Sequence, residues 1–428
     1  MICCGLDIGS TNVKVVLADG DGRSIWVKSV PSPRLDDGIG IATDATALVL
    51  LIEDMIIEGW RAVAKGKPLS AISSAGVGED GVCADTALQP LGLVIPWFDK
   101  RAMREVEAFR AAWHFTRVDF HSTAAKWMWM RKHRPSEIGG AQTWITLTDY
   151  ASSLWFGAPF MSETLAARTG CYDLVNRRWS NDALAFAGAP PLPRLLKTGE
   201  IAGTAGPGRL REAGAVSSST LIVAGGHDHP IASSAILRLN AEARIDSLGT
   251  ANALYGETRV ASPNIDDSLE ATVPAMCGDG LALVGVTEFT ATLDAKYGKS
   301  APKALLQLPR LPGEPNGSGD DEASCIRRTL EEMALRGRNF LSCFDRAGVL
   351  RGQLYATGGW ARSTALMELR ASMFREPITV VDEPELVGLG AALLGLEAAM
   401  GRDCSFTPAR GVHTVDPLGR WAEAYSGL

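Results

Sequence analysis

The chain has 428 residues, 46% of them hydrophobic and 21% charged, which predicts a soluble globular protein with two domains rather than one. The formal net charge is −7 and no basic run offsets it, so we expect neither nucleic acid nor an anionic membrane as a partner. The longest apolar run, near 45–57, is interrupted by Glu53 and Asp54 and therefore does not predict a membrane span.

Eight cysteines are scattered along the chain, and none forms a CxxC pair or accompanies a histidine cluster. This spacing argues against a zinc site or a disulfide framework and favours a reducing compartment. The first ten residues contain Asp7 and no basic leader, so no secretory signal is predicted. We therefore expect a cytoplasmic protein, and a homodimer is an open alternative to a monomer.

Short apolar runs separated by turn formers predict three N-terminal strands, at 2–8, 12–18 and 24–30. The first turn places the carboxylate of Asp7 beside Gly9, Ser10 and Thr11, with Lys14 nearby. Backbone N–H groups and hydroxyls in such a turn can bind phosphate oxygens, and Asp7 could hold Mg²⁺, usually through water. The alternative is an ordinary hairpin turn rich in turn formers.

A predicted helix at 44–64 and a predicted strand at 71–77 lead to a polar turn that contains Gly78, Glu79 and Asp80. Carboxylates accept hydrogen bonds from sugar hydroxyls, so this turn could bind a sugar. It could equally be a solvated loop.

A predicted strand at 91–97 runs into Trp97-Phe-Asp-Lys-Arg101, and a predicted helix at 101–113 follows. An aromatic face beside Asp99 and the forked donor Arg101 suits a polyhydroxylated ligand. The alternative is a strand end followed by a helix that carries a surface ion pair.

Four apolar residues at 221–224 predict a buried strand that two glycines break, and 230–237 predicts a helix with Pro230 in its first turn. Asp228 lies at this strand-to-helix corner, where the helix dipole favours its ionised form. A fixed, ionised carboxylate can accept a hydroxyl proton, which is a role in phosphoryl transfer. The simpler alternative is that Asp228 only caps the helix.

A second unit begins near Leu221. The strand–turn–strand pattern at 245–256, with Gly249 and Thr250 in the turn, weakly echoes the first hairpin and suggests two related halves. A later strand, at 354–357, ends in Gly358 and Gly359, which let a nucleotide approach the backbone closely. The remaining expectations are a strand at 280–287, an exposed loop at 311–323, and helices at 325–347 and 385–400.

Taken together, these stretches resemble the FGGY family of carbohydrate kinases. The matching pieces run in family order and are Gly5–Thr11, Trp97–Arg101, Gly225–Asp228, Ser247–Thr250, Gly358–Ser363 and Glu385–Ala392. The tail at 415–425 also resembles the closing segment of the family. The resemblance implies an α/β, two-domain ribonuclease H-like (actin-like ATPase) fold with a cleft between the domains. It implies domains at 1–225 and 226–428, with the option that the last ~20 residues pack back on the first domain.

The resemblance also implies ATP-dependent phosphorylation of a sugar or polyol hydroxyl, with ATP and Mg²⁺ as cofactors. Asp228 would be the catalytic base, and Asp7 would sit with Asp228 at the Mg²⁺ site. The implied nucleotide-binding residues are Gly9, Ser10, Thr11, Lys14, Gly249, Thr250, Gly358, Gly359 and Trp360. The implied substrate-binding residues are Gly78, Glu79, Asp80, Trp97, Asp99, Arg101 and His229.

Xylulose kinases of this family carry Gln-Met-His at the substrate loop, where this chain has Gly78, Glu79 and Asp80, and this departure argues against a ketopentose substrate. Two acids there should repel aldonates, so the sequence predicts a small neutral sugar or polyol as substrate. The alternatives are a non-kinase ATPase switch of the same fold and a sugar-binding regulator that has lost catalysis.

Overall fold

The computed structural model describes residues 1–112, 118–276, 278–298 and 321–419, together with Leu311, Pro315, Trp421 and Tyr425. The chain forms two compact units. Unit 1 contains Met1–Ala235 and Glu385–Phe406, and unit 2 contains Ile236–Pro384 and Thr407–Leu428. These units divide the chain differently from the predicted domains 1–225 and 226–428: Asp228 and the helix after Glu385 lie in unit 1, and the closing segment lies in unit 2.

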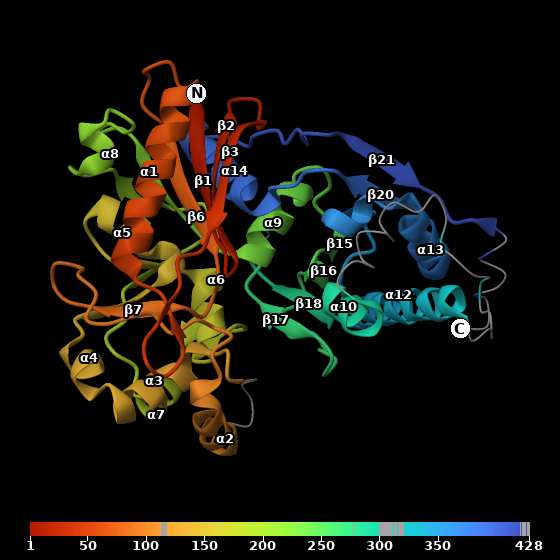
Figure 1. Ribbon diagram of the computed structural model, residues 1–428, viewed down its shortest axis with the longest axis horizontal. Coiled ribbons are helices and arrows are strands. Elements are labelled where there is room, and N and C mark those ends of the chain that lie inside the picture. Colours follow the sequence, from red (N-terminus) through yellow and green to blue (C-terminus); the bar gives the residue numbers. More distant parts are fainter. Residues whose placement is uncertain are drawn as a thin grey trace. The chain divides into compact units, whose positions relative to one another are not determined.

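Unit 1 is built on a mixed sheet of six strands in the order β13-β14-β6-β1-β2-β3 (Figure 1). The strands are β1 (Ile2–Ile8), β2 (Asn12–Asp19), β3 (Ser24–Pro31), β6 (Ala71–Gly76), β13 (Ile201–Thr204) and β14 (Leu221–His227). The first three form an antiparallel meander, while β1, β6 and β14 are parallel neighbours. The three N-terminal strands therefore lie where the turn residues predicted them.

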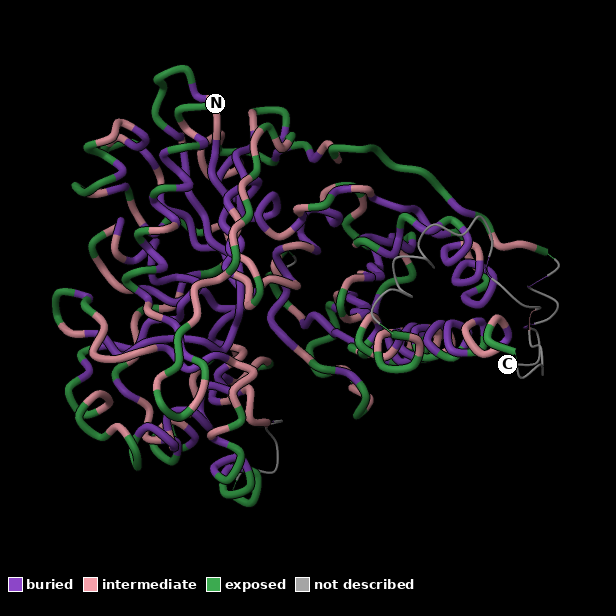
Figure 2. Tube along the Cα trace, viewed as in Figure 1, coloured by how far each residue is buried: buried purple, intermediate pink, exposed green. Residues whose placement is uncertain are grey.

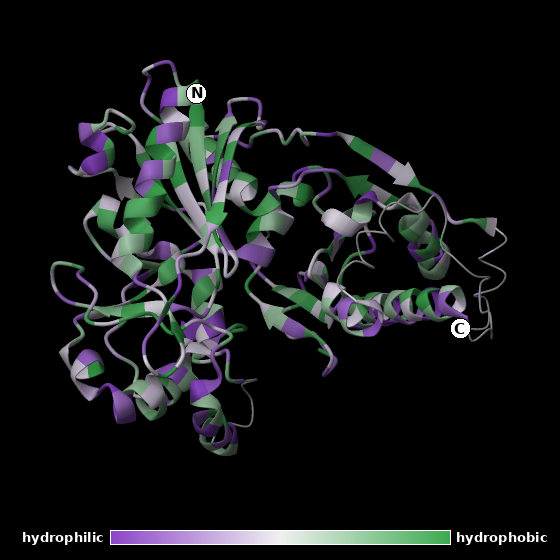
Figure 3. Ribbon diagram, in the orientation of Figure 1, coloured by the Kyte–Doolittle hydropathy of each residue, from purple (hydrophilic) through white to green (hydrophobic). Residues whose placement is uncertain are grey.

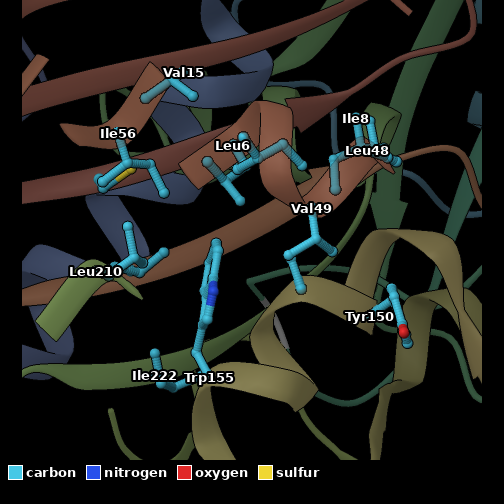
Figure 4. Packing of buried hydrophobic residues seen from close by; sticks show 14 of the residues in the cluster. Leu6, Ile8, Val15, Leu48, Val49, Ile56, Tyr150, Trp155, Leu210 and Ile222 are labelled. Atoms are coloured by element: carbon cyan, nitrogen blue, oxygen red, sulfur yellow. The ribbon is translucent and has the colours of Figure 1, made fainter. Parts of the chain in front are cut away.

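The two faces of β1 have different partners because successive side chains point to opposite sides of a sheet. Cys4, Leu6 and Ile8 point into the main hydrophobic core, which also contains side chains of α1 (Ala45–Val63) and α5 (Leu147–Phe156) (Figure 4). Both strands β1 and β6 are almost wholly buried (Figure 2). The α1 helix confirms the predicted helix at 44–64, with Asp44 as its N-cap.

The other face of β1 is covered by α14 (Leu386–Met400), a helix that is distant in sequence but contacts β1, β6, β2 and β14. Glycines allow the close approach: a Cβ on Gly5 would overlap the Gly388 carbonyl oxygen, and a Cβ on Gly388 would lie 2.6 Å from Val16 Cγ2. This contact explains why the segment after Glu385 belongs to unit 1 rather than to a C-terminal domain.

The β14 strand does not break at its two glycines. It continues to His227 with a bulge between Val223 and Gly226, and α9 (Asp228–Leu237) begins at once. Gly226 adopts φ +153°, and a Cβ there would overlap Thr164 Oγ1. The glycines therefore re-aim the end of the strand, which places Asp228 in the first turn of the helix.

The rest of unit 1 is made of short elements. The predicted strand at 91–97 is wrong: the segment makes one isolated bridge, between Val94 and Thr43. The short strands are β4 (Leu35–Asp36), β5 (Ile41–Ala42), β7 (Gly81–Ala84), β8 (Thr143–Thr146), β9 (Phe160–Ser162), β10 (Tyr172–Asp173), β11 (Arg178–Trp179) and β12 (Arg194–Leu196). The helices are η1 (Lys100–Ala102), α2 (Met103–Ala112), α3 (Thr123–His133), α4 (Pro135–Gly140), α6 (Glu163–Ala166), η2 (Ala167–Thr169), α7 (Asn181–Ala187) and α8 (Arg209–Glu212). The predicted helix at 101–113 is confirmed to Ala112, and Trp113 lies outside the described residues.

Unit 2 repeats the topology around its own sheet of seven strands, in the order β17-β18-β16-β15-β19-β20-β21. The strands are β15 (Arg244–Leu248), β16 (Ala251–Thr258), β17 (Glu270–Thr272), β18 (Leu281–Glu288), β19 (Leu354–Thr357), β20 (Ile378–Val381) and β21 (Val412–Val415). As in unit 1, a central strand pairs antiparallel with the strand after it and parallel with a later one. The weak sequence echo between the two hairpins therefore reflects a shared topology.

The second core lies between this sheet and its helices, which are α10 (Thr290–Tyr297), α12 (Glu322–Arg346), η3 (Gly359–Arg362) and α13 (Thr364–Phe374). The α12 helix has interspersed polar and apolar residues (Figure 3) and confirms the predicted helix at 325–347. Most of the predicted loop at 311–323 lies outside the described residues. Within the described part of the chain, no helix is both long and apolar enough to cross a membrane.

Candidate active site

The turn between β1 and β2 is held by hydrogen bonds that fix its peptide groups. Gly9 N–H donates to Asn12 O (3.1 Å), Ser32 Oγ donates to Gly9 O (2.6 Å), and Arg34 Nη2 donates to Ser10 O (2.7 Å). In a trans peptide the C=O and the next N–H point in opposite directions. The N–H groups of Ser10 and Thr11 therefore point away from Ser32 and Arg34, as an anion-binding turn requires.

Three charged side chains meet beside this turn, on the α14 face of the sheet. Asp7 and Lys14 are cross-strand partners, with Lys14 Nζ 3.6 Å from Asp7 Oδ2 and 2.7 Å from Glu385 Oε2. Burial raises the pKa of Asp7 to about 7, against the opposing effect of Lys14, and the nearby Asp228 and Glu385 raise it further. The site therefore concentrates negative charge that one lysine does not balance, which favours a bound cation.

Asp228 follows β14 directly and is fixed through one of its oxygens. Asp228 Oδ1 accepts the His229 backbone N–H (2.6 Å) and lies 3.2 Å from His227 Nε2, while the side chain is 32% exposed. Burial favours the neutral carboxyl, but the histidines, the His229 N–H and Arg168 outweigh it, so the pKa of Asp228 lies below its usual value. Asp228 is therefore ionised at neutral pH. Both contacts described above involve Oδ1, which leaves Oδ2 for a ligand.

His227, the residue before Asp228, is a neutral imidazole at neutral pH. Burial lowers its pKa to about 4, against the attraction of Asp228. His227 Nε2 lies 3.2 Å from Asp228 Oδ1, while Nδ1 is buried and has no hydrogen-bond partner among the described residues. Its ring packs against Gly78, where a Cβ would lie 2.9 Å from His227 Cδ2 and overlap the stem of Arg168. The absence of a side chain at Gly78 therefore makes room for both residues.

The two acids of the substrate loop are buried, and each has a basic partner. Arg168 donates to Glu79 Oε1 through Nε (2.7 Å) and lies 2.6 Å from it through Nη2. Lys126 Nζ lies 3.3 Å from Asp80 Oδ1, and both side chains are at most 1% exposed. Arg168 leads the groups that hold the pKa of Glu79 down against the opposing effect of burial, whereas burial raises the pKa of Asp80. The two acids therefore do not act as an uncompensated negative pair, and the expected repulsion of aldonates loses its basis.

The Trp97–Arg101 segment is mainly structural. Arg101 is 4% exposed on its side chain and is paired with Asp37 (2.7 Å) and Asp99 (2.8 Å), and its guanidinium lies over the Trp129 ring. Arg101 and Asp99 therefore anchor the segment rather than offer free groups to a ligand. Trp97 packs at 5.1 Å, centroid to centroid, against the ring of His121.

Unit 2 has a second hydrogen-bonded turn, at Gly249 and Thr250 between β15 and β16. Gly249 N–H donates to Ala251 O (2.9 Å), and Thr250 is exposed. Gly358, at the end of β19, adopts φ +94°, and a Cβ there would overlap the Leu248 carbonyl oxygen. Gly358 is therefore required for close packing against the strand that leads into the Gly249–Thr250 turn. Trp360 is only 5% exposed and belongs to the core of unit 2.

Comparison with known proteins assigns the chain to a family. The model for the N-terminal domain of the FGGY family of carbohydrate kinases matches residues 2–234, and the model for the C-terminal domain matches residues 298–399. The chain belongs to the FGGY family of carbohydrate kinases. It is an ATP-dependent sugar or polyol kinase.

The relatives of this carbohydrate kinase, and the solved structures that are similar to it, have several names. A gluconokinase of Bacillus subtilis is 23% identical over 92% of this chain and 87% of the relative, and a xylulose kinase of Streptomyces coelicolor is 22% identical over 97% and 91%. A xylulose kinase structure from Brucella ovis has a TM-score of 0.85 at 21% identity, covering 100% of this chain and 97% of that one. The glycerol kinase of Plasmodium falciparum with ADP has a TM-score of 0.81 at 14% identity over 100% and 96%. These structures confirm the two-domain, actin-like fold.

In this carbohydrate kinase, the structure brings together within unit 1 several residues that the motifs marked separately, among them Asp7, Lys14, Glu79 and Asp228. Sequence reasoning missed Arg168, which acts electrostatically on Asp228, Glu79 and Asp119, and it missed the Asp119–His121 pair. Arg168 lies in η2, in a stretch without a recognisable motif. Only the turn former Gly170, which ends that helix, gave a local signal.

Proposed function

We propose that the kinase transfers the γ-phosphate of Mg·ATP to a hydroxyl of a small neutral sugar or polyol, with Asp228 as the base. The ionised and fixed Asp228 carboxylate carries this proposal. Its free oxygen, Oδ2, accepts the proton of the substrate hydroxyl as the hydroxyl oxygen bonds to the γ-phosphorus. The bond from phosphorus to the β-phosphate oxygen breaks, and ADP leaves. Because the transition state is loose, positioning and charge stabilisation matter more than early proton removal.

In unit 1, the N–H groups of Ser10 and Thr11 and the ammonium of Lys14 would bind phosphate oxygens. In unit 2, the Gly249–Thr250 turn would bind phosphate, and the Gly358–Gly359 backbone would border the adenosine. Both turns have backbone groups held by hydrogen bonds, which supports a preorganised phosphate site.

Asp7 fits Mg²⁺ on the chemistry of its surroundings. Its burial beside Glu385 and Asp228 leaves negative charge that a divalent cation would balance. Among the described residues, no three His, Cys, Asp or Glu side chains form a complete metal site. This agrees with Mg²⁺, which is usually bound by one or two carboxylates plus phosphate oxygens and water. When bound, the ion would neutralise charge that develops on the phosphates.

The preference for a neutral substrate is supported by the pairing of the basic groups. Arg168 and Lys126 are each engaged with a carboxylate, at Glu79 and Asp80 respectively. An aldonate carboxylate would have to compete with those acids, whereas a neutral hydroxyl can donate to Glu79 or Asp228 without displacing either cation.

The test compares substrates that differ only at the carboxylate: sorbitol with gluconate, and xylitol with xylonate, alongside neutral pentoses, hexoses and ketoses. ADP release from Mg·ATP is measured for the wild type and Asp228→Asn. We expect one neutral compound to stimulate ADP release. In Asp228→Asn, the stimulated rate should be roughly 10²- to 10⁴-fold lower than in the wild type. Faster turnover on an aldonate would reject the neutral substrate, and steady hydrolysis that no compound stimulates would favour an ATPase switch.

We also propose a cytoplasmic location, in keeping with the lack of a disulfide among the seven described cysteines. A homodimer stays a prediction, and light scattering of the purified protein tests it.

A further inference from the structure

Unit 2 contains a hydrogen-bonded relay that joins the two stretches assigned above to the nucleotide. We name Gly249–Thr250 the phosphate turn and Gly358–Arg362 the adenosine-side loop. Between them lies Thr290, the first residue of α10, which Phe289 separates from the end of β18. This residue belongs to none of the motifs that carried the family resemblance.

The hydroxyl of Thr290 contacts both stretches. Thr290 Oγ1 is 2.9 Å from the Gly249 carbonyl oxygen and 3.0 Å from Trp360 Nε1. The indole N–H can only donate and the carbonyl can only accept, so the direction of both bonds is fixed. Trp360 donates to the Thr290 hydroxyl, and the hydroxyl donates to Gly249.

The backbone at the start of α10 holds the other carbonyl of the phosphate turn. Thr290 N–H donates to Thr250 O at 3.0 Å, and Phe289 N–H reaches the same oxygen at 3.4 Å. The Phe289 ring packs edge-on against Trp360, with centroids 5.3 Å apart. Both carbonyls of the turn are therefore drawn toward one residue pair.

The orientation of the turn has a chemical consequence. The peptide between Gly249 and Thr250 is trans, so its N–H points opposite to its carbonyl. Because Thr290 holds the carbonyl, the Thr250 N–H is directed away from α10, on the side where an anion could accept it. If the Thr290 hydroxyl were lost, this peptide could rotate and the donor would no longer be fixed.

We propose that Thr290 is a positioning residue for the nucleotide: it fixes the phosphate turn and couples it to the adenosine-side loop through Trp360. The inference rests on the proposed placement of ATP on these two stretches. It also gives Trp360 a role different from direct contact with adenosine, since the indole is buried and its N–H is used by Thr290.

The test measures binding of Mg·ADP and Mg·ATP by calorimetry, which does not depend on turnover, together with KM for ATP and for the acceptor. Thr290→Val keeps the branched shape but removes both side-chain bonds, and we expect nucleotide Kd and KM to rise about 5- to 50-fold. The acceptor KM should stay within about twofold because the relay does not touch unit 1 residues. Thr290→Ser keeps the hydroxyl and should restore binding to within about threefold of wild type.

Thr287→Val is the matched control. Thr287 lies on β18, the strand before α10, and its Oγ1 is buried without a hydrogen-bond partner among the described residues. This change should leave nucleotide binding unaltered. Trp360→Phe removes the indole donor and part of the ring but leaves the Thr290 bond to Gly249, so it should weaken binding less than Thr290→Val.

The outcomes separate two kinds of failure. If the wild type binds nucleotide and Thr290→Val binds it equally well, the relay is wrong while the proposed function stands. Equal losses in Thr290→Ser and Thr290→Val would also reject the relay, because the shared change would then be in packing rather than in the hydroxyl. If the wild type binds no adenine nucleotide, the proposed nucleotide site itself fails.

Discussion

Glu79 and Arg168 show how a partner that is distant in sequence changes the charge of a side chain. The sequence placed Glu79 in the substrate loop but gave no sign of Arg168, which is 89 residues further along the chain. The predicted role of Glu79 as an uncompensated negative charge depended on that missing partner. The net charge of a site depends on all the side chains that lie close together in space. A local sequence motif does not include the partners that come from distant parts of the chain.

This pairing predicts the effect of Glu79→Gln. The change removes the carboxylate that occupies Arg168, so the guanidinium can bind a substrate carboxylate instead. We expect the ratio of kcat/KM for gluconate to that for sorbitol to rise roughly tenfold, even if both values fall. Glu105→Gln is the control, since Glu105 is buried and paired with Lys132 (2.9 Å) on a different element. An unchanged ratio in Glu79→Gln would remove Arg168 from substrate choice.

His227 predicts a dependence of stability on pH. Its pKa is about 4 in the fold against an ordinary value of 6.5, so the unfolded chain binds more protons between these values. Above pH 6.5 the imidazole is neutral in both the folded and the unfolded chain. As the pH falls from 6.5 toward 4, the unfolded chain takes up the proton first, and the free energy of unfolding decreases. The full shift corresponds to about 3 kcal/mol.

His227→Gln keeps a polar side chain next to Asp228 but does not titrate in this range. We expect the wild type to lose more thermal stability than this variant between pH 7 and pH 4.5. Melting temperatures at a series of pH values measure the difference, and parallel profiles for the two proteins would contradict the prediction.

At the scale of elements, local signals predicted the hairpins and the long helices well. The β1–β2–β3 meander follows from short apolar runs and the Asp19–Gly22 turn, and these are properties of neighbouring residues. The failure at 91–97 has the opposite cause, since an apolar run can be buried by irregular packing as well as by a strand. In β14, the glycines were interpreted as breakers, whereas contacts with Ser74 and Thr164, distant in sequence, make them a bulge within the strand.

The packing of α14 on β1 predicts that Gly5→Ala is strongly destabilising. The added Cβ would overlap the Gly388 carbonyl oxygen and lie 2.5 Å from Ala392 N, and both are helix backbone that cannot move aside alone. We expect a loss of roughly 3 kcal/mol or more, measured as a lower melting temperature and soluble yield. Gly139→Ala, where nothing lies within 4 Å of the new Cβ, should be close to neutral. Equal stability of the two variants would show that α14 does not pack closely on β1.

At the scale of the whole molecule, the motifs predicted two units with related topology, but they did not predict which segments build each unit. Six motifs in order identify a family, yet the order does not show that Glu385–Phe406 returns to unit 1. That return is set by the complementary glycines of β1 and α14, which lie almost 400 residues apart and make no local pattern.

Because unit 1 is built from two segments that are distant in sequence, we can predict how its fragments behave. Residues 1–235 alone lack α14, so the face of β1 and β6 that this helix covers would be exposed, and we expect an aggregating fragment. Joining Glu385–Phe406 through a flexible linker should restore a soluble unit. Cooperative thermal unfolding followed by circular dichroism checks both proteins. A stable, cooperative 1–235 fragment would contradict the prediction.

The late position of α14 has a consequence for biosynthesis. The strands of the first sheet leave the ribosome early, but the helix that covers one of their faces follows only after roughly 150 further residues. At elongation rates of ~5–20 residues per second, this delay is about 8–30 s. During that time the nascent chain carries an uncovered apolar sheet, so its yield in the cell should depend on holdase chaperones and on translation speed across residues 236–384.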